Sequence, residues 1–254
     1  MIKKFIKFPK KLTKENLVKY FKKNNLIGKT NIKTEEFSPE LNDLYILHQL
    51  IILNKRLTVL EFGTGWSTLV IQHALNINKI RFNNSAKKVR KINKFETFVV
   101  DDSKKYLNIS KKRIQKVLGK SNNCKFQFSE CNMTMINGKY ASEYQKLPLC
   151  NPDFIYLDGP NPMNTKKKIN EFTTAHEDLM PMSCDILKFE HFLIPGTIIL
   201  IDGRTANARF LKSNFQRNWE YLHDKKNDQN LFYLKEDPLG EINSIQLKFY
   251  ANSI

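Results

Sequence analysis

The sequence predicts an α/β domain in which a mostly parallel sheet carries helices on both faces. Four short aliphatic runs, LTVLEF, FETFVVD, DFIYLDG and GTIILID, are separated by segments with helical spacing. Continuous apolar strands that alternate with helices are typical of a parallel sheet covered on both sides. The first run leads through two glycines, Gly63 and Gly65, directly into an apolar helix. We expect residues 1–50 to form a helical cap and residues 51–254 to form the α/β domain.

The remaining elements follow in order along the chain. LTKENLVKYFKKNNL places Leu17, Tyr20 and Phe21 on one helical face, and Ser38-Pro39-Glu40 precedes the amphipathic helix ELNDLYILHQLIIL. The alternation in CKFQFSE predicts a further strand. Two of the segments WEYLHD, NLFYLKE and SIQLKFY would complete a seven-stranded sheet, and the residues alone do not decide between them. The other expected helices are STLVIQHALNI, SKKYLNISKKRIQKVLG, NTKKKINEFTTAHEDLM, CDILKFEHFL and TANARFLKSNFQ.

Composition and charge limit the possible functions. The chain has 254 residues, 41% of them hydrophobic, and a net charge of +17. A surface this basic attracts nucleic acid or anionic lipid. The basic residues are nevertheless spread along a chain that is rich in Lys, Asn and Ile throughout, without an Arg-rich stripe interleaved with aromatics. We therefore favour a general compositional bias, and a nucleic-acid partner is not expected.

The cysteines and the apolar runs indicate the cellular compartment in which the protein is expected. Cys124, Cys131, Cys150 and Cys184 have neither CxxC spacing nor His partners at metal-finger distances. They are expected to be reduced, buried thiols in a cytoplasmic protein. No apolar run reaches the roughly 18 residues of a membrane span, and the N-terminal MIKKFIKFPKK lacks the apolar core of a signal peptide. The sequence does not determine the oligomeric state, and a homodimer is one of the states it allows.

The glycine loop predicts a ligand site. At a strand-to-helix turn, Gly63 and Gly65 allow unusual backbone dihedral angles and the close approach of a ligand. Ligands of open parallel sheets bind beyond the carboxyl ends of the strands, near helix N-termini such as the one at Ser67. The dinucleotide pattern GxGxxG is not met, because residues 66–68 supply no third glycine. Glu61 at the strand end would repel a pyrophosphate and would suit a cationic amine or a zwitterion.

From Leu57 to Asp202 the chain resembles the class I S-adenosylmethionine-dependent methyltransferases. EFGTG is similar to the E/D-x-G-x-G motif of that family, and FVVDDSKKYL, FQFSE, FIYLDGP and IPGTIILIDG follow in the family's order. The resemblance implies a Rossmann-like, seven-stranded sheet and S-adenosylmethionine as cofactor. In the family the loop wraps the methionine part of the cofactor, and an acid in the position of Glu61 reaches its amine.

The resemblance also implies roles for the acids at the other strand ends. Asp101, or its neighbour Asp102, takes the position of the acid that binds the ribose hydroxyls. Glu130 takes the position of an acid that contacts the adenine amino group, and Asp158 lies at the mouth of the catalytic pocket. The expected cofactor-binding residues are Glu61, Phe62, Gly63, Thr64, Gly65, Trp66, Ser67, Asp101, Asp102, Glu130 and Asp158.

The chain departs from the family pattern at three points. Ser67 stands in place of a third glycine, a variant that resembles the small-molecule O-methyltransferase branches. An insertion at residues 78–94 lengthens the gap between the first two acids and is expected to form a basic surface loop near the adenosine. Asp158 and Asp202 match two carboxylate ligands of metal-dependent O-methyltransferases, but Gly203 replaces the third ligand, an Asn. A divalent metal is therefore not expected.

A hydroxyl acceptor needs a base, and the acceptor itself needs contacts from the protein. A histidine is a common base, and His176 lies in the expected helix after YLDGP. An arginine just beyond the fifth strand would hold an anionic group, and the helices before the first strand occupy the place of the family's substrate lid. The candidate bases are Asp158, Asp202 and His176. The candidate acceptor contacts are Arg204, Tyr45 and His48.

The expected reaction is O-methylation of a small-molecule hydroxyl, on a sugar or another metabolite. DGPNPMN lacks the adjacent prolines and the aromatic residue with which base-methylating enzymes hold a flipped base. DGPN also lacks the second Asp of the aminopropyl transferases, which share the fold. The alternatives are an RNA methyltransferase that uses the basic surface and a non-catalytic cofactor-binding scaffold.

Overall fold

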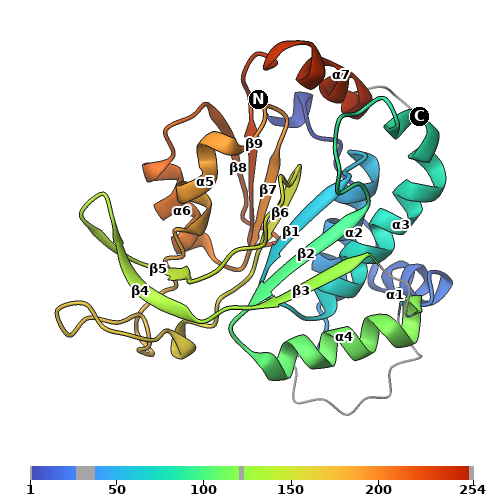
Figure 1. Cartoon of the computed structure of the whole chain (residues 1–254). Helices are drawn as coiled ribbons and strands as arrows, with labels where there is room; N and C mark the ends of the chain where they lie inside the picture. Colours follow the sequence, from blue (N-terminus) through green and yellow to red (C-terminus); the bar gives the residue numbers. More distant parts are fainter. Residues whose placement is uncertain (1, 27–37, 120–122, 252–254) are drawn as a thin grey trace.

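A seven-stranded sheet organises the computed structural model, which describes residues 2–26, 38–119 and 123–251. The strand order is β3-β2-β1-β6-β7-β9-β8 (Figure 1). The first five strands are parallel, and β9 runs antiparallel to both of its neighbours. The predicted mostly parallel sheet is therefore confirmed. The strands are β1 (Thr58–Phe62), β2 (Glu96–Asp101), β3 (Cys124–Phe128), β6 (Phe154–Leu157), β7 (Ile198–Asp202), β8 (Trp219–Asp224) and β9 (Gln229–Leu234).

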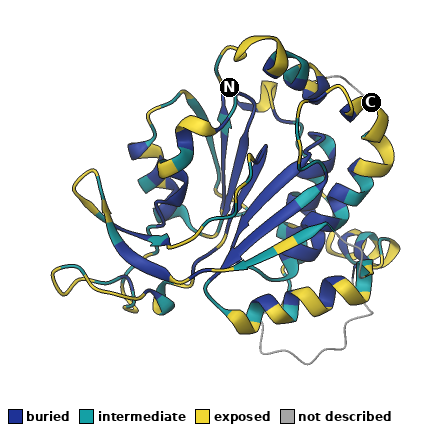
Figure 2. Cartoon of the chain, viewed as in Figure 1, coloured by how far each residue is buried: buried dark blue, intermediate teal, exposed yellow. Residues whose placement is uncertain are grey.

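Side chains of the central strands alternate between two apolar layers, one on each face of the sheet. Val59, Tyr156 and Leu200 pack with residues of α2, α3 and α7. Leu60 and Ile155 pack on the other face with residues of α5 and α6. Figure 2 shows the central strands buried between these helices. The helices are α1 (Lys14–Lys23), α2 (Leu41–Leu53), α3 (Trp66–Ala86), α4 (Lys104–Leu118), α5 (Asp185–Phe189), α6 (Thr205–Asn214) and α7 (Gly240–Ala251).

The N-terminal segments pack directly on the α/β domain. Ile2 and Ile6 join the apolar cluster shared with α2 and α7. The ring of Phe5 stacks on that of Tyr233, with 4.9 Å between the ring centroids. Helix α1 contributes to a third cluster together with α2 and α3. Residues 27–37 of the predicted cap lie outside the described residues. Within the described ranges, no helix combines the length and the apolarity needed to cross a membrane.

The segment after β6 does not form the predicted helix NTKKKINEFTTAHEDLM. A single 3-10 turn (Pro162–Asn164) is followed by irregular chain up to α5. Asn170 and Glu171 have positive φ angles of 50° and 61°, which a right-handed helix excludes. The Met133 N–H donates to the Lys166 carbonyl oxygen at 3.0 Å, one of several backbone hydrogen bonds that tie this segment to β4 and β5. The prediction was wrong because these tertiary hydrogen bonds outweigh a weak helical periodicity.

Strands β4 (Cys131–Ile136) and β5 (Lys139–Tyr144) form a separate antiparallel hairpin that projects from the main sheet (Figure 1). Its turn consists of Asn137 and Gly138, with φ angles of 50° and 71°. An Asn-Gly pair is the preferred sequence for a tight two-residue hairpin turn. The hairpin was missing from the predicted elements, although this dipeptide was the signal that could have found it.

The C-terminal region resolves the choice between three candidate strands. WEYLHD is β8 and NLFYLKE overlaps β9, whereas SIQLKFY lies within α7. The buried residues of α7 are Asn243, Gln246, Phe249 and Tyr250, and their spacing of three and four residues is that of a helix. The antiparallel strands β8 and β9 therefore complete the sheet. Helix α7 covers the same face of the sheet as α3.

The insertion at residues 78–94 lies at the amino ends of the strands, away from the glycine loop. Its first part continues α3, and the chain then returns to β2. Thr58 Oγ1 donates to the Asn93 carbonyl oxygen at 2.6 Å, and Lys91 Nζ lies 3.7 Å from Asp153 Oδ2, just before β6. The expected loop near the adenosine was wrong, because the inserted residues extend the helix toward the opposite edge of the sheet.

Candidate functional site

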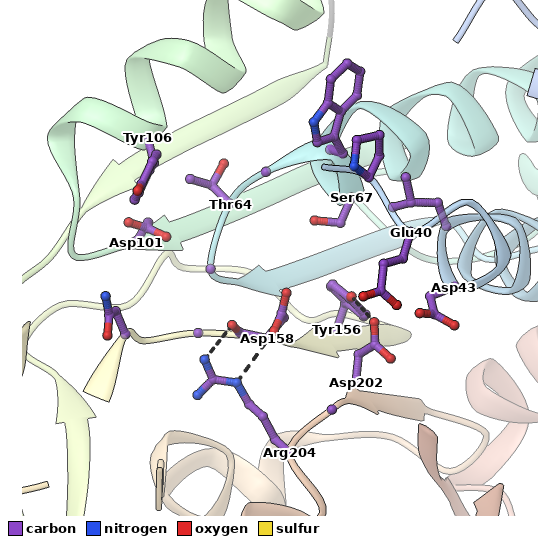
Figure 3. Close-up of a pocket in the computed structure, with 18 of the residues that line it drawn as sticks. Glu40, Asp43, Thr64, Ser67, Asp101, Tyr106, Tyr156, Asp158, Asp202 and Arg204 are labelled. Atoms are coloured by element: carbon purple, nitrogen blue, oxygen red, sulfur yellow. Dashed lines mark hydrogen bonds and ion pairs between the residues drawn. The ribbon is translucent and has the colours of Figure 1, made fainter. Parts of the chain in front are cut away.

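A cavity of about 730 Å³ opens at the carboxyl edge of the sheet. Its walls come from the glycine loop after β1, the ends of β2, β6 and β7, the start of α2 and the turn between β8 and β9 (Figure 3). Parallel strands bring all of these ends to one edge, where ligands of such sheets bind. The cavity therefore lies where the glycine loop predicts a ligand.

The glycine loop fits tightly against the end of β6. Gly63 has a φ angle of +96°, a conformation that residues with a side chain rarely adopt. A Cβ added to Gly159 would lie 2.5 Å from the nitrogen and 2.6 Å from the Cα of Gly63. The neighbouring Gly65 precedes α3, and a Cβ there would meet only Ser67 Oγ, at 4.0 Å. The loop is thus fixed on its inner side and open to the cavity on its outer side, where Thr64, Gly65, Trp66 and Ser67 line it.

Glu61 lies behind the loop with a fully buried side chain. Ser67 Oγ donates to Glu61 Oε1 at 2.5 Å, while Oε2 has no hydrogen-bond partner in the part of the chain that the structure describes. Burial raises the pKa of the Glu61 carboxyl to about 8, and the negative charges of Asp158 and Asp101 add to the shift. This shift favours the protonated form of the carboxyl group at neutral pH.

Asp101 ends β2 and faces the cavity beside Asp102 and Tyr106. The Ser103 N–H donates to Asp101 Oδ1 at 2.6 Å and fixes the orientation of the carboxyl group. Burial raises the pKa of Asp101 to about 7. Burial also raises the pKa of Asp102. Two strand-end acids with restricted access to water can accept hydrogen bonds from neutral hydroxyl groups.

Asp158 and Arg204 form a pair on the other side of the cavity. Arg204 Nη2 donates to the Asp158 carbonyl oxygen at 2.7 Å, and Arg204 Nε lies 3.6 Å from Asp158 Oδ1 (Figure 3). Desolvation by the surrounding protein raises the pKa of Asp158, and the nearby guanidinium group of Arg204 opposes this shift. Arg204 lines the cavity, as expected of an acceptor contact, but its charge is directed at Asp158.

Asp202 ends β7 and is held by a tyrosine of the neighbouring strand. Tyr156 OH donates to Asp202 Oδ2 at 3.0 Å. Burial, together with the charge of Asp158, raises the pKa of Asp202 to about 6. Its carboxyl group therefore titrates close to neutral pH, the range in which a general base works well.

Two acids that the sequence analysis did not select complete this side of the cavity. Glu40 precedes α2 and Asp43 lies in its first turn, and both carboxyl groups point toward Asp202 in Figure 3. Burial, a hydrogen bond with Glu40 and the charge of Asp202 raise the pKa of Asp43 to about 7. The available signal was the helix start at Ser38-Pro39-Glu40, because a helix that leads into β1 begins at the carboxyl edge of the sheet.

The structure does not bring Tyr45 and His48 to the cavity. Tyr45 OH donates to the Lys10 carbonyl oxygen at 3.0 Å. His48 is fully buried, with Nδ1 2.5 Å from Tyr20 OH and Nε2 2.9 Å from His73 Nδ1. Both side chains pack between α1, α2 and α3. Neither side chain therefore lines the cavity, because α2 turns a different face toward it.

Three further predicted residues lie away from the cavity. Phe62 is buried on the face of the sheet that α5 and α6 cover. Its ring stacks on that of Tyr144, with 6.0 Å between the ring centroids. Glu130 is exposed at the start of the hairpin. His176 is exposed on the irregular segment and accepts a hydrogen bond from the Asp178 N–H at 3.2 Å. The proposed site therefore includes none of the three.

Asp158 and Asp202 are the two residues that the family resemblance implies as carboxylate ligands of a metal-dependent enzyme. Among residues 2–26, 38–119 and 123–251, no group of three or more His, Cys, Asp or Glu has the arrangement of a metal site. Gly203, which follows Asp202, contributes no side chain. Arg204 and Tyr156 contact the two carboxyl groups instead.

No protein-family model matches this sequence, and neither does any curated protein. Among solved structures, an O-methyltransferase from Bacillus cereus in complex with SAH is 15% identical, covering 92% of this chain and 95% of that chain with a TM-score of 0.42. An SAH-bound Podospora anserina methyltransferase is 13% identical, with 92% of each chain covered and a TM-score of 0.47. A tRNA (m1A58) methyltransferase from Aquifex aeolicus is 15% identical, covering 84% of this chain and 74% of that chain with a TM-score of 0.43. Likeness at this level identifies neither a cofactor nor a substrate of the present chain.

Proposed function

We propose that this protein is an S-adenosylmethionine-dependent methyltransferase that methylates a hydroxyl group of a small molecule. The observation that carries the proposal is the arrangement of three features at the carboxyl edge of the sheet. These are a glycine loop whose outer side is open to the cavity, a strand-end acid that lines the cavity, and a fully buried carboxyl group behind the loop, one oxygen of which has no hydrogen-bond partner among the described residues. The residues that provide them are Gly65, Glu61 and Asp101.

The residues fit this cofactor better than they fit a dinucleotide. Oε2 of Glu61 is a buried acceptor whose carboxyl group would be ionised by a nearby amine, as the methionine part of the cofactor provides. Asp101 and Asp102 offer acceptors for ribose hydroxyls. Arg204 is the only basic residue among the described residues that line the cavity, and it contacts Asp158. A pyrophosphate would meet mostly acids here, and like charges repel.

The acids on the far side of the cavity supply the proton chemistry. When bound, S-adenosylmethionine would supply the methyl group: its carbon–sulfur bond breaks, a carbon–oxygen bond to the acceptor forms, and the hydroxyl proton leaves to a base. Asp202, with a pKa of about 6, can accept that proton and release it near neutral pH. Tyr156 holds the Asp202 carboxyl group in place, and Arg204 holds that of Asp158. We assign the role of base to Asp202 and that of orienting the acceptor to Asp158.

The charge of the cavity also favours a small acceptor over a nucleic acid. Glu40, Asp43 and Asp202 lie together at the end of the cavity away from Asp101 and Tyr106. A phosphate backbone that entered there would be repelled by these acids. Residues 159–164, directly after Asp158, include no aromatic residue on which a flipped base could stack. Both observations support a small-molecule acceptor.

A methyl-transfer screen tests the proposed reaction. Labelled S-adenosylmethionine is incubated with the protein and with metabolite pools or RNA, each with and without EDTA. We expect label on a small molecule, with no loss of rate in EDTA. Asp202→Asn should lower kcat by about a hundredfold or more, because general-base catalysis contributes at least that factor. The rate of the parent protein should rise with pH through about 6, as Asp202 ionises.

Label on RNA bases would contradict the assignment of the acceptor. Product formation by Asp202→Asn and Asp158→Asn at the parent rate would remove both acids from the mechanism. Lys139→Gln, a substitution on the projecting hairpin, controls for general effects of expression and charge, and we expect it to leave the rate unchanged.

A further inference from the structure

The insertion at residues 78–94 is strongly basic and takes no part in the cavity. It contains no Asp or Glu, and apart from Lys91 its basic residues are Lys79, Arg81, Lys87, Lys88, Arg90 and Lys94. No acidic side chain of residues 2–26, 38–119 and 123–251 forms an ion pair with any of these six. The insertion therefore carries a concentration of positive charge that ion pairs within the described chain do not neutralise.

Three loops at the amino edge of the sheet each expose a large apolar side chain. Ile92 is 98% exposed, Leu149 is 97% exposed and Phe192 is 77% exposed. Two hydrogen bonds join the loops. Lys91 Nζ donates to the Asn151 carbonyl oxygen at 2.5 Å, and Asn151 Nδ2 donates to the Phe192 carbonyl oxygen at 3.2 Å. The three side chains therefore belong to one region, which together with the basic residues of the insertion we call the amino-edge surface.

The packing of the loop leaves Ile92 on the outside of the protein. Val89 and Phe95, on either side of it in the sequence, are buried in the apolar cluster shared with α2, α3 and α7. Between them, Lys91 Nζ lies 3.7 Å from Asp153 Oδ2. The loop is thus held to the domain at three points, none of which is Ile92. Single exposed apolar side chains are common on protein surfaces, but three on adjoining loops indicate an interaction site.

The charges around the three apolar side chains favour an anionic partner. Asp153 and Glu190, the acids near Leu149 and Phe192 in the sequence, are buried, with 0% and 2% of their surface exposed. Glu96, the acid that follows the insertion, is paired with Lys125 at 2.7 Å between Oε2 and Nζ. These acids do not offset the basic residues of the insertion, so the amino-edge surface is positive.

A lipid bilayer matches this surface better than nucleic acid or a second copy of the chain. Ile92 and Leu149 are aliphatic, whereas side chains that hold single-stranded nucleic acid are aromatic and stack on the bases. A second copy would bring the same positive charge and would be repelled. Apolar side chains that project from loops can enter the boundary between headgroups and acyl chains, and anionic headgroups attract nearby Lys and Arg residues.

We propose that the amino-edge surface docks on an anionic lipid bilayer. Ile92, Leu149 and Phe192 enter the boundary between the headgroups and the acyl chains, and the basic residues of the insertion contact the headgroups. This inference does not depend on the proposed function. The cavity lies at the carboxyl edge of the sheet, at the other end of the parallel strands (Figure 1), so docking leaves it free to bind its ligands.

Co-sedimentation with lipid vesicles tests the proposal. One set of vesicles consists of phosphatidylcholine alone, and the other also contains about 30% phosphatidylserine. We expect at least about tenfold stronger partition to the anionic vesicles, because each Lys or Arg near an anionic surface strengthens binding by about fivefold. Raising the salt concentration from about 0.1 M to about 0.5 M should release most of the bound protein, because salt screens this attraction.

Two double variants examine the apolar and the basic parts separately. Ile92→Ser with Leu149→Ser should lower the partition at least about tenfold, because two aliphatic side chains no longer leave water. Lys88→Gln with Arg90→Gln should lower it about tenfold or more on anionic vesicles. All four side chains are exposed, so the midpoint of urea denaturation should not change.

Matched controls remove the same kinds of group elsewhere on the protein. Met135 is 50% exposed on the projecting hairpin, and Lys225 is exposed in the turn between β8 and β9. Met135→Ser and Lys225→Gln should leave the partition unchanged.

Failure of the parent to bind anionic vesicles would overturn the proposal, and so would a partition that the Ile92→Ser, Leu149→Ser variant leaves unchanged. Analytical ultracentrifugation and an RNA mobility-shift assay measure the other two occupants. A dimer that the Ile92→Ser, Leu149→Ser variant dissociates would assign the surface to a second copy and overturn the proposal. RNA binding that Lys88→Gln with Arg90→Gln abolishes, without binding to vesicles, would also overturn it.

Discussion

Gly159→Ala is expected to unfold much of the cofactor site and to lower the free energy of unfolding by about 3 kcal/mol or more. The new Cβ would lie 2.5 Å from the Gly63 nitrogen, 2.6 Å from the Gly63 Cα and 2.9 Å from the Phe62 carbonyl carbon. All three are backbone atoms, which cannot move aside as the end of a flexible side chain can. Relief requires the glycine loop to shift away from β6. That shift would strain the hydrogen bond from the Gly63 N–H to the Val100 carbonyl oxygen, 2.9 Å long.

The measurement is chemical denaturation together with calorimetric titration of S-adenosylmethionine. We expect affinity to fall by about a hundredfold or more, because the loop that forms the proposed cofactor site is displaced. Gly138→Ala is the matched control. Its φ angle is +71° and a Cβ there would have nothing within 4 Å, so only local strain of about 1–2 kcal/mol is expected. Normal cofactor binding by Gly159→Ala would contradict the close contact between the two glycines.

Glu61→Gln is expected to stabilise the free protein at high pH. The pKa of Glu61 is about 8 in the folded state against an ordinary value of 4.5. Between these values the folded state holds a proton that the unfolded state has lost, so this carboxyl group lowers stability as pH rises from about 4.5 to about 8. Above about pH 8 the ionised Glu61 carboxyl group lowers the free energy of unfolding by its full amount, roughly 3–5 kcal/mol. Glutamine does not ionise and can still accept the hydrogen bond from Ser67.

Urea denaturation at about pH 5, 7 and 9 measures this effect. Parent and variant should be similar at the lowest pH, and the variant should become progressively more stable as pH rises. Gln72→Glu is unsuitable as a control, because it would introduce an ionisable group at another buried site. The control is Glu130→Gln. That substitution removes an exposed carboxyl group and should leave the pH dependence unchanged. Parallel curves for parent and Glu61→Gln would contradict the raised pKa.

The same substitution should weaken cofactor binding. A cationic amine favours the ionised form of Glu61, so the affinity of the parent for S-adenosylmethionine should increase as pH rises toward about 8. Asp101, with a pKa of about 7, adds to the increase if its ionised form binds the ribose. Glu61→Gln should bind more weakly above neutral pH and should lose part of this pH dependence. We thus expect Glu61 to lower the stability of the free protein and to raise its affinity for the cofactor.

The fold and the cofactor side of the site could be predicted because their signals are local. Four of the five parallel strands are short apolar runs, and each of Glu61, Asp101, Asp158 and Asp202 lies at or next to the carboxyl end of one. The topology then brings these ends to a single edge. The role of Gly63 could also be predicted, because a strand-to-helix turn of this kind needs the backbone conformation that glycine adopts most easily.

The acceptor side depended on contacts between residues distant in the sequence, which a local pattern does not encode. Asp43 meets Asp202 only because α2 begins at the carboxyl edge of the sheet. Tyr45 lies two positions further along the same helix and faces α1 instead. His176 was expected on a helix, but backbone pairing with the hairpin draws its segment into an irregular path. Pairing of this kind is decided by tertiary structure.

The central claim is that the cavity binds S-adenosylmethionine through the glycine loop and Asp101. Calorimetric titration of the purified protein with S-adenosylmethionine and, separately, with NAD tests it most directly. We expect one molecule of S-adenosylmethionine to bind per chain and NAD to bind weakly or not at all. Asp101→Ala should weaken binding by about 10- to 100-fold, as expected for the loss of hydrogen bonds to a charged group. Gly65→Arg should abolish binding by filling the open side of the loop. Binding of NAD without binding of S-adenosylmethionine, or an Asp101→Ala variant as tight as the parent, would contradict the account.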